Sequence, residues 1–317
     1  MKKVIISTLL SRNGFLCIVI IALGIILSFL SPYFLEVSNL LSMTQFGALL
    51  ALVGMGQTLV IIGGRGGIDL SVGSIVSFSG VLLALLYNGG LNIWLACLAA
   101  VIIGGLLGTL NGFLVSSLSM PPLIVTLGTS YIFSSLSLVL TKGVPVSGLP
   151  ASFRFIGQTQ LFGIPTQIII IVIPVFIILN WMIKNTVFGR SIYMIGVNDR
   201  AGRLVGINVK KVRVVLYTIS GLLSGFGAII MTSWLMAAKP DIGTGYDTQA
   251  ITVAVLGGAS MFGGEGSLFG TILAVLIITM ISNGLQLANI NTVWQLAVLG
   301  ILLLVSIMIN NLFEQRK

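Results

Sequence analysis

The chain has 317 residues, of which 56% are hydrophobic and only 7% are charged, and its net charge is +9. Soluble domains contain about 25% charged residues, so this composition excludes a globular domain that faces water on all sides. The sequence contains no histidine, and its two cysteines, Cys17 and Cys97, lie within apolar stretches. We therefore expect a polytopic membrane protein with no catalytic residues, no metal site and no cofactor.

Apolar stretches of the length of a membrane helix recur along the whole chain. A spanning helix needs about 20 mostly apolar residues, so the predicted fold class is an all-α integral membrane protein with about ten transmembrane helices. Segment 247–260 is the weakest of them and also fits a broken or re-entrant helix, which is allowed where protein or water covers it. The predicted spans are 14–31, 46–63, 72–87, 92–117, 122–140, 167–183, 213–234, 247–260, 267–287 and 293–312.

The basic residues predict the orientation of the chain, because Lys and Arg concentrate on the cytoplasmic side of membrane proteins. With ten spans and an inner amino terminus, all but three of the 16 Lys and Arg residues fall inside. An odd number of spans would place Arg316 and Lys317 outside, so both termini are predicted to be cytoplasmic. The same asymmetry explains the positive net charge without nucleic acid as a partner. The three outer residues are Lys142, Arg154 and Lys239.

The longest inner connection, 184–212, contains the pattern of a short helix. Asn198 or Asp199 can cap the amino end of this helix, and Gly206 can end it. Its apolar residues recur at helical spacing and so form one stripe. Such a helix suits either a groove on a partner protein or the lipid headgroups. The stripe consists of Ala201, Leu204 and Val205.

Three groups of motifs resemble one family of transport proteins, the sugar-type ABC importer permeases, which include ribose, xylose and autoinducer-2 permeases. They occur in the order typical of that family, and the resemblance extends over roughly residues 30 to 312. The first group is Gly67-Ile68-Asp69-Leu70-Ser71-Val72-Gly73-Ser74. The second is Phe188-Gly189-Arg190, Gly196-Val197-Asn198, Ala201, Leu204, Gly206-Ile207 and Val209. The third is Gly243-Thr244-Gly245-Tyr246, Ala250-Ile251, Val255-Leu256-Gly257-Gly258 and Gly263-Gly264-Glu265-Gly266.

The resemblance implies a single transmembrane permease domain over residues 1–317 in the bacterial inner membrane. It implies a sugar or sugar-like solute, a second permease copy or a related permease, a cytoplasmic ATP-binding subunit and an extracytoplasmic solute-binding protein. ATP hydrolysis is then expected on the partner, and the chain itself is not an enzyme. The short inner helix would be the coupling helix that sits on the ATPase. By the resemblance, that role falls on Asn198, Ala201, Leu204, Gly206 and Ile207.

Asp69 and Arg65 lie together in the glycine-rich stretch 63–74. A carboxylate at the centre of a bilayer costs about 2.5–3.5 kcal/mol on insertion scales, so Asp69 requires a partner or water. Asp69 either caps the helix that begins near Leu70 or contacts solute. Arg65, in a Gly-Arg-Gly insertion that the family usually lacks, either holds Asp69 ionised or stays in cytoplasmic water. Glu265 is expected in a cap or a turn.

Polar side chains on otherwise apolar helices are candidates to line a solute pathway, because amides and hydroxyls suit neutral polyols. The alternative is that they form hydrogen bonds between helices. Glycines that repeat every four residues, such as Gly104 with Gly108 and Gly221 with Gly225, predict either close helix packing or a subunit contact. The polar candidates are Gln57, Asn111, Gln249, Asn283, Gln286 and Gln295, together with Asp69 and Ser71 of the first motif.

An ion-coupled secondary transporter is the alternative function. Such carriers usually bury acidic residues within the bundle. The predicted spans contain essentially none at mid-membrane, and the chain contains no histidine. A membrane-bound transferase would need a catalytic set that the sequence lacks. Transport by the isolated chain without ATP would favour the ion-coupled alternative.

Overall fold

The computed structural model describes residues 12–291 and, beyond them, residues 294, 297, 298, 300, 301, 304 and 308. The predicted span 293–312 and Gln295 thus fall wholly or mostly outside the described residues. The helices are α2 Arg12–Leu30, α3 Val37–Ile62, α4 Val72–Asn88, α5 Ile93–Ser116, α6 Pro122–Thr141, η1 Ala151–Phe153, α7 Arg154–Gly157, η2 Ile168–Val172, α8 Ile173–Asn185, α9 Val187–Val197, α10 Asp199–Leu204, α11 Val209–Leu235, α12 Tyr246–Leu256 and α13 Leu268–Leu287. Two strands, β1 Gln160–Leu161 and β2 Ile164–Pro165, pair as an antiparallel hairpin.

Seven of the described helices are long and apolar enough to cross a membrane: α2, α3, α5, α6, α11, α13 and η2 with α8. The described part of the chain is therefore an all-α membrane protein, as predicted. Helix α4, of 17 residues, is slightly shorter than these, and α12 has only 11 residues. The predicted span 46–63 is also longer than expected, because α3 begins at Val37.

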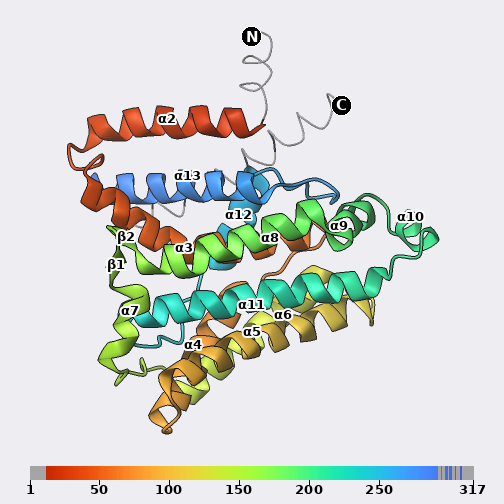
Figure 1. Ribbon diagram of the computed structural model, residues 1–317, viewed down its shortest axis with the longest axis horizontal. Coiled ribbons are helices and arrows are strands. Elements are labelled where there is room, and N and C mark those ends of the chain that lie inside the picture. The colour runs from red at the N-terminus through yellow and green to blue at the C-terminus, as the bar shows by residue number, and fades with distance from the viewer. Residues whose placement is uncertain are drawn as a thin grey trace.

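The long helices lie side by side, with the short elements gathered at their two ends (Figure 1). The hairpin and α7 lie at one end, and α10 lies at the other. Backbone hydrogen bonds between Val146 and Ala238 tie the two loops at the hairpin end together. The charged residues follow this division. Lys142 and Lys239 lie at the hairpin end, whereas Arg200 and Arg203 lie on α10.

Helix α3 is the centre of the bundle, with 89% of its most apolar window buried. It packs against α11, α12 and α13. The largest contact between two helices joins α5 and α11, through glycines. A Cβ atom on Gly108 would lie 2.2 Å from the carbonyl oxygen of Tyr217, and one on Gly221 would lie 2.1 Å from that of Gly104. The glycine repeat therefore serves close packing within the chain.

Glycine and proline explain two irregular elements, the short helix α12 and the π-helical turn η2. Helix α12 follows Gly245, which has a φ of +84°, and ends at Leu256, before Gly257 and Gly258, the second of which has a φ of +114°. It ends before residue 260, where the predicted segment ends, and at 1.5 Å per residue it spans about 16 Å, half of a hydrocarbon core. The π-helical turn η2 precedes Pro174, which has no N–H to donate to the preceding turn.

Candidate functional site

Four of the predicted residues meet in one buried cluster around the Asp69 carboxylate. Its Oδ1 atom accepts from the Ser71 N–H at 3.0 Å and from the Ser71 hydroxyl at 2.6 Å. Asn111 donates to the same hydroxyl at 2.7 Å, so the Ser71 proton is directed to Asp69. The Gln57 amide, in the orientation that satisfies both groups, pairs with the backbone N–H and carbonyl of Asp69 at 3.2 and 3.1 Å. All four side chains are fully buried.

Ser220 completes the Asp69 cluster from α11, and sequence reasoning missed it. Its hydroxyl donates to Asp69 Oδ2 at 3.0 Å. Four helices, α3, α4, α5 and α11, thus meet in one hydrogen-bond network around Asp69, which is the interhelical role predicted for these polar residues as the alternative to a pathway role. Three donors on Asp69 offset the cost of removing it from water. The only signal in the sequence was the pair Ser220 and Ser224, four residues apart on an apolar helix.

The Asp69 cluster lies inside the bundle rather than at its surface, nearer to the carboxyl end of α3 than to its amino end. Ser220 is eleven residues into α11, about 16 Å from the first residue of that helix. Gln57 is five residues before the end of α3, about 8 Å from it. The connection 63–71 therefore turns at the end of α3 and runs back along the helix before α4 begins. The sequence had predicted that 64–71 would form an inner loop.

Arg65 does not form an ion pair with Asp69 in the described part of the chain, where the only two ion pairs involve other residues. The Arg65 side chain is exposed, and its backbone has a φ of +58°. The hypothesis that Arg65 holds Asp69 ionised is therefore wrong, because serine hydroxyls and an N–H occupy the carboxylate instead. Glu265 lies in the loop before α13, but the side chain that caps α13 is Ser267.

The remaining amides line an open polar cavity of about 200 Å³ between α3, α12 and α13. Asn283 exchanges two hydrogen bonds of 2.9 Å with Asn39 at its edge. Gln249 and Gln286 line the cavity, and no side-chain hydrogen bond joins either amide to another of residues 12–291. Their hydrogen-bonding groups are therefore available to a solute. The other lining residues are Met43, Phe46, Leu50, Tyr246, Ile278, Thr279 and Ser282.

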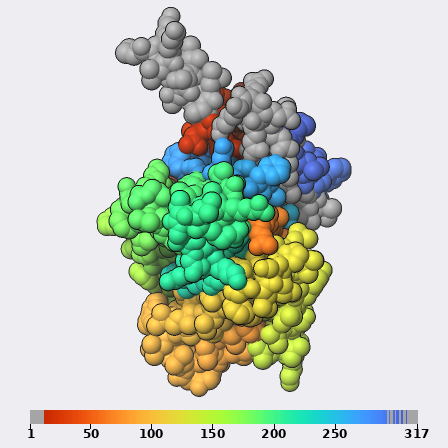
Figure 2. Space-filling view, turned by 90° about the vertical axis from the view of Figure 1, so that its right-hand side faces the viewer, coloured from red at the N-terminus to blue at the C-terminus, as the bar shows by residue number. Residues whose placement is uncertain are grey.

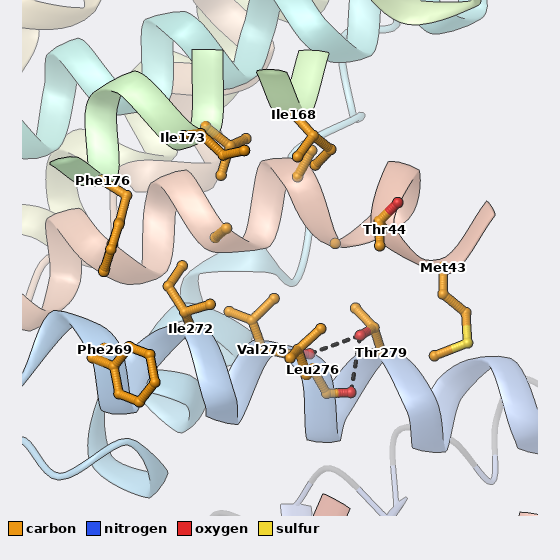
Figure 3. A pocket seen from close by; sticks show the side chains of 14 residues that line it. Met43, Thr44, Ile168, Ile173, Phe176, Phe269, Ile272, Val275, Leu276 and Thr279 are labelled. Carbon is orange, nitrogen blue, oxygen red and sulfur yellow. Dashed lines mark hydrogen bonds between the residues drawn. The ribbon is translucent and has the colours of Figure 1, made fainter. Parts of the chain in front are cut away.

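A second cavity, of about 240 Å³, is apolar and lies between α3, α13 and the η2–α8 helix (Figure 3). The side chains around it include Ile173, Phe176 and Ile272. The Thr279 hydroxyl donates to the carbonyls of its own helix, at Val275 and Leu276 (Figure 3). Because that hydroxyl is satisfied locally, this cavity presents carbon to an occupant and suits an acyl chain rather than a polar solute.

The predicted coupling residues lie at the opposite end, around α10. Asn198 caps this helix by accepting from the N–H groups of Arg200 and Ala201, as the sequence predicted. Gly206, with a φ of +83°, lies just beyond its end. Leu204 is 87% exposed, Ala201 is also exposed, and Ile207 is half-buried against the core. In Figure 2, which faces this end of the molecule, residues 184–212 (green to turquoise) stand at the centre of the described surface.

Arg213 joins α10 to the membrane bundle. Its guanidinium group binds both carboxylate oxygens of Asp199, one of them through Nη1 at 2.9 Å. Nη2 also lies 3.4 Å from the carbonyl oxygen of Gly63, just after α3. Sequence reasoning counted Arg213 only as an orienting charge. The position of an arginine near the start of a long apolar helix was its only signal.

A glycine junction, formed by Gly64, Gly196, Gly263 and Gly264, packs the carboxyl end of α9 against the connection after α3 and the loop before α13. A Cβ atom on Gly196 would lie 2.0 Å from the carbonyl oxygen of Ile62 and 2.3 Å from the Gly264 nitrogen. The Gly264 N–H donates to that Ile62 oxygen at 2.9 Å. No residue with a side chain fits at Gly196. The carboxyl end of α9, which leads directly into α10, therefore lies against the carboxyl end of α3 and the loop before α13.

Tyr193 of α9 adds one more contact next to the glycine junction. Its hydroxyl donates to the carbonyl oxygen of Gly266 at 2.9 Å. Burial raises the pKa of the Tyr193 phenol above its usual value, so this group remains a neutral donor at physiological pH.

The described part of the chain thus combines membrane-spanning helices, a polar cavity and a short exposed helix, α10, at one end. The chain belongs to the family described as branched-chain amino acid transport system / permease component, whose model matches residues 39–307. It is thus a multi-pass membrane permease component of an ABC importer, a transport rather than a catalytic subunit. No solved structure matches the chain.

Curated relatives of the chain share its length. The ribose import permease protein of Bacillus subtilis is 39% identical, over 91% of this chain and 89% of the relative. The D-allose transport system permease protein of Escherichia coli is 36% identical, over 90% and 87%. The autoinducer 2 import system permease protein of Escherichia coli is 33% identical, over 90% and 82%.

Proposed function

We propose that this chain forms part of the translocation pathway for a sugar or sugar-like solute, with the polar cavity at Asn283 as a section of that pathway. The observation that carries the proposal is the lining of the cavity by amides and hydroxyls from α12 and α13. Neutral polyols are bound by such groups. The named substrates of the relatives, ribose and D-allose among them, belong to the same chemical class.

The cavity favours a neutral solute over an amino acid, despite the description of the family. A zwitterion in a low-dielectric site needs charged partners. The side chains that line the cavity include no Asp, Glu, Lys or Arg, and Tyr246 is the only ionisable group among them.

Ten membrane spans with both termini in the cytoplasm complete the proposed architecture of this single transmembrane domain. The short helices α4 and α12 count as spans in this arrangement, and the tenth lies in 293–312. Arg12 at the start of α2 donates to the carbonyl of Val255 at the end of α12. This contact supports an amino terminus on the same side as α10.

A cytoplasmic ATP-binding subunit would dock on α10, and an extracytoplasmic solute-binding protein would deliver solute at the hairpin end. Two permease copies, identical or related, would enclose the pathway, and ATP hydrolysis would take place on the partner. The ATP-binding subunit would bind α10 differently before and after ATP hydrolysis, and this difference in binding free energy would shift the permease between inward and outward access. The exposed apolar tip of α10 supports such a docking role.

Uptake by the reconstituted complex tests the proposal. The permease, purified with its ATP-binding subunit and placed in vesicles with its solute-binding protein, should accumulate ribose or allose only when ATP is supplied. Leucine should not be accumulated. ATP-dependent uptake of leucine but of neither sugar would contradict the assignment of the cavity.

A substitution on α10 tests the docking of the ATP-binding subunit separately. Leu204→Asp should abolish coupled uptake while membrane insertion remains normal, because a carboxylate would have to be buried in the apolar contact. Unchanged uptake in the complete complex would contradict docking through this residue.

An ion-coupled secondary transporter is the second candidate function. Burial of the acidic Asp69 inside the bundle favours it, since carriers use such groups. The three hydrogen bonds on Asp69 and its separation from the polar cavity argue for a structural role instead. Accumulation by the chain alone, driven by a proton or sodium gradient without nucleotide, would establish this second function.

A further inference from the structure

Helix α3 connects the α10 end of the molecule with the polar cavity. Phe46 and Leu50 of α3 line that cavity, and the carboxyl end of α3 packs against the carboxyl end of α9, which leads directly into α10. Phe46 and Gly63 are seventeen residues apart, about 25 Å along the helix. Because α3 is packed on nearly all sides, a displacement at one end moves the other end with it.

The carboxyl end of α3 is fastened by groups that belong to other segments. The last carbonyls of a helix have no partner within it. Here the Ile62 carbonyl accepts from the Gly264 N–H at 2.9 Å, and the Gly63 carbonyl accepts from Arg213 at 3.4 Å. The same guanidinium group holds Asp199, the first residue of α10. One side chain therefore binds both α10 and the end of α3.

The Asp199–Arg213 pair is too buried to be explained by surface electrostatics. The side chains are 22% and 6% exposed, whereas those of the other described ion pair, Lys239–Asp241, are 45% and 62% exposed at 3.7 Å. Burial of two charges costs desolvation energy, so such a pair is weak evidence for stability as such. It does fix one geometry, with both oxygens of Asp199 held by a planar fork.

We propose that Asp199 and Arg213 are positioning residues that fasten α10 to the carboxyl end of α3, so that α3 carries the movement of α10 to the polar cavity. This inference rests on the proposed function, because it takes α10 as the site where the ATP-binding subunit acts. Asn198, not Asp199, caps α10, so α10 keeps its cap when Asp199 is changed.

Thiol labelling inside the cavity tests the proposal without knowledge of the solute. In the complete complex, Cys17 and Cys97 are replaced by Ala, and Ser282→Cys introduces one thiol into the cavity lining. The labelling rate with a water-soluble maleimide is measured without nucleotide and with ATP and vanadate. Binding of the ATP-binding subunit and ATP hydrolysis are measured in parallel.

We expect nucleotide to change the labelling rate about tenfold in this background. Asp199→Asn should reduce that change to less than about twofold, while subunit binding and ATP hydrolysis are retained. The charge-swapped pair Asp199→Arg with Arg213→Asp should restore part of the response. The matched change in the exposed pair, Asp241→Asn, should leave the response intact.

Two results would overturn the inference alone. One is an unchanged nucleotide response in Asp199→Asn, and the other is loss of the ATP-binding subunit in that variant, since Asp199 would then act in docking. A background complex that shows no nucleotide response would overturn the proposed function and the inference with it. Uptake of leucine in place of sugar would contradict the proposed substrate but leave this inference standing.

Discussion

The two polar regions of the bundle are built from the same kinds of side chain and differ in what surrounds them. Around Asp69, an acid, two amides and two serines are fully buried, and their hydrogen bonds run between helices. Around Asn283, amides and hydroxyls surround an open space of about 200 Å³. The acid is found in the closed region, and the open region has no charged side chain among its lining residues.

This difference separates structural from pathway candidates by a physical criterion. A buried amide that hydrogen-bonds to neighbouring helices is out of reach of a solute, even at Asn111, whose Oδ1 atom has no partner among the described residues. An amide that faces an open cavity can exchange water for solute at little cost. The four predictions below test this criterion, in order of decreasing effect on the free energy of unfolding.

Asp69→Ala should have the largest effect, with a loss of about 3 kcal/mol. The substitution removes the acceptor of the Ser71 N–H and of two hydroxyls, all in a fully buried site. Unfolding of the purified protein in detergent, followed by heat or denaturant, measures the loss. A variant as stable as the parent would show that the cluster does not hold the helices together.

Asn283→Leu should cost about 1 kcal/mol, since the reciprocal pair with Asn39 is lost in a partly exposed place. Uptake should fall more than stability does, because the cavity loses a polar contact. The two effects are separated by comparing transport per folded molecule with the unfolding midpoint. If uptake fell only in proportion to the folded fraction, Asn283 would belong with the structural group.

Asp69→Asn should cost about 1 kcal/mol or less and retain most of the uptake. The amide oxygen can still accept from Ser71, and the amide nitrogen can donate to Ser220, whose hydroxyl also accepts. Loss of transport from a normally folded variant would instead assign a function to the charge itself.

Ser282→Phe and Leu276→Phe form a matched pair on α13, since the first side chain faces the polar cavity and the second faces the apolar one. Each should change stability by less than about 0.5 kcal/mol, as expected for changes outside the core. Only Ser282→Phe should block uptake, by filling the polar cavity. Equal losses of uptake in both variants would remove the distinction between the two cavities.

Much of the fold could be predicted from the sequence, because apolar stretches and the residues that begin or end helices act on their near neighbours in the chain. The predicted span 72–87 became α4 at Val72–Asn88, and 122–140 became α6 at Pro122–Thr141. The amino-terminal start of α3 at Val37 was missed, because Ser38, Asn39 and Ser42 lower the local hydropathy. The count of ten spans and the cytoplasmic termini stay predictions, since they depend on residues beyond the described part.

The candidate site was predicted only in part, because its contacts join residues far apart in the chain. Gln57, Asp69 and Asn111 were chosen one by one as polar residues on apolar segments. Their convergence, and the contribution of Ser220, depends on the segment 63–71 running back beside α3. Arg65 was the nearest cation in sequence, but its side chain is exposed, and no ion pair joins it to Asp69 in the described part of the chain.

The sequence by itself determined that this chain is a helical membrane protein, where most of its helices begin and end, and that α10 presents an apolar tip. Those properties depend on composition and on neighbours within one or two helical turns. Only the tertiary structure decided which polar residues are closed off in hydrogen bonds, which face open space, and that Arg213 binds Asp199. Such pairings span up to about 240 positions, as between Asn39 and Asn283, and are set by how the helices pack.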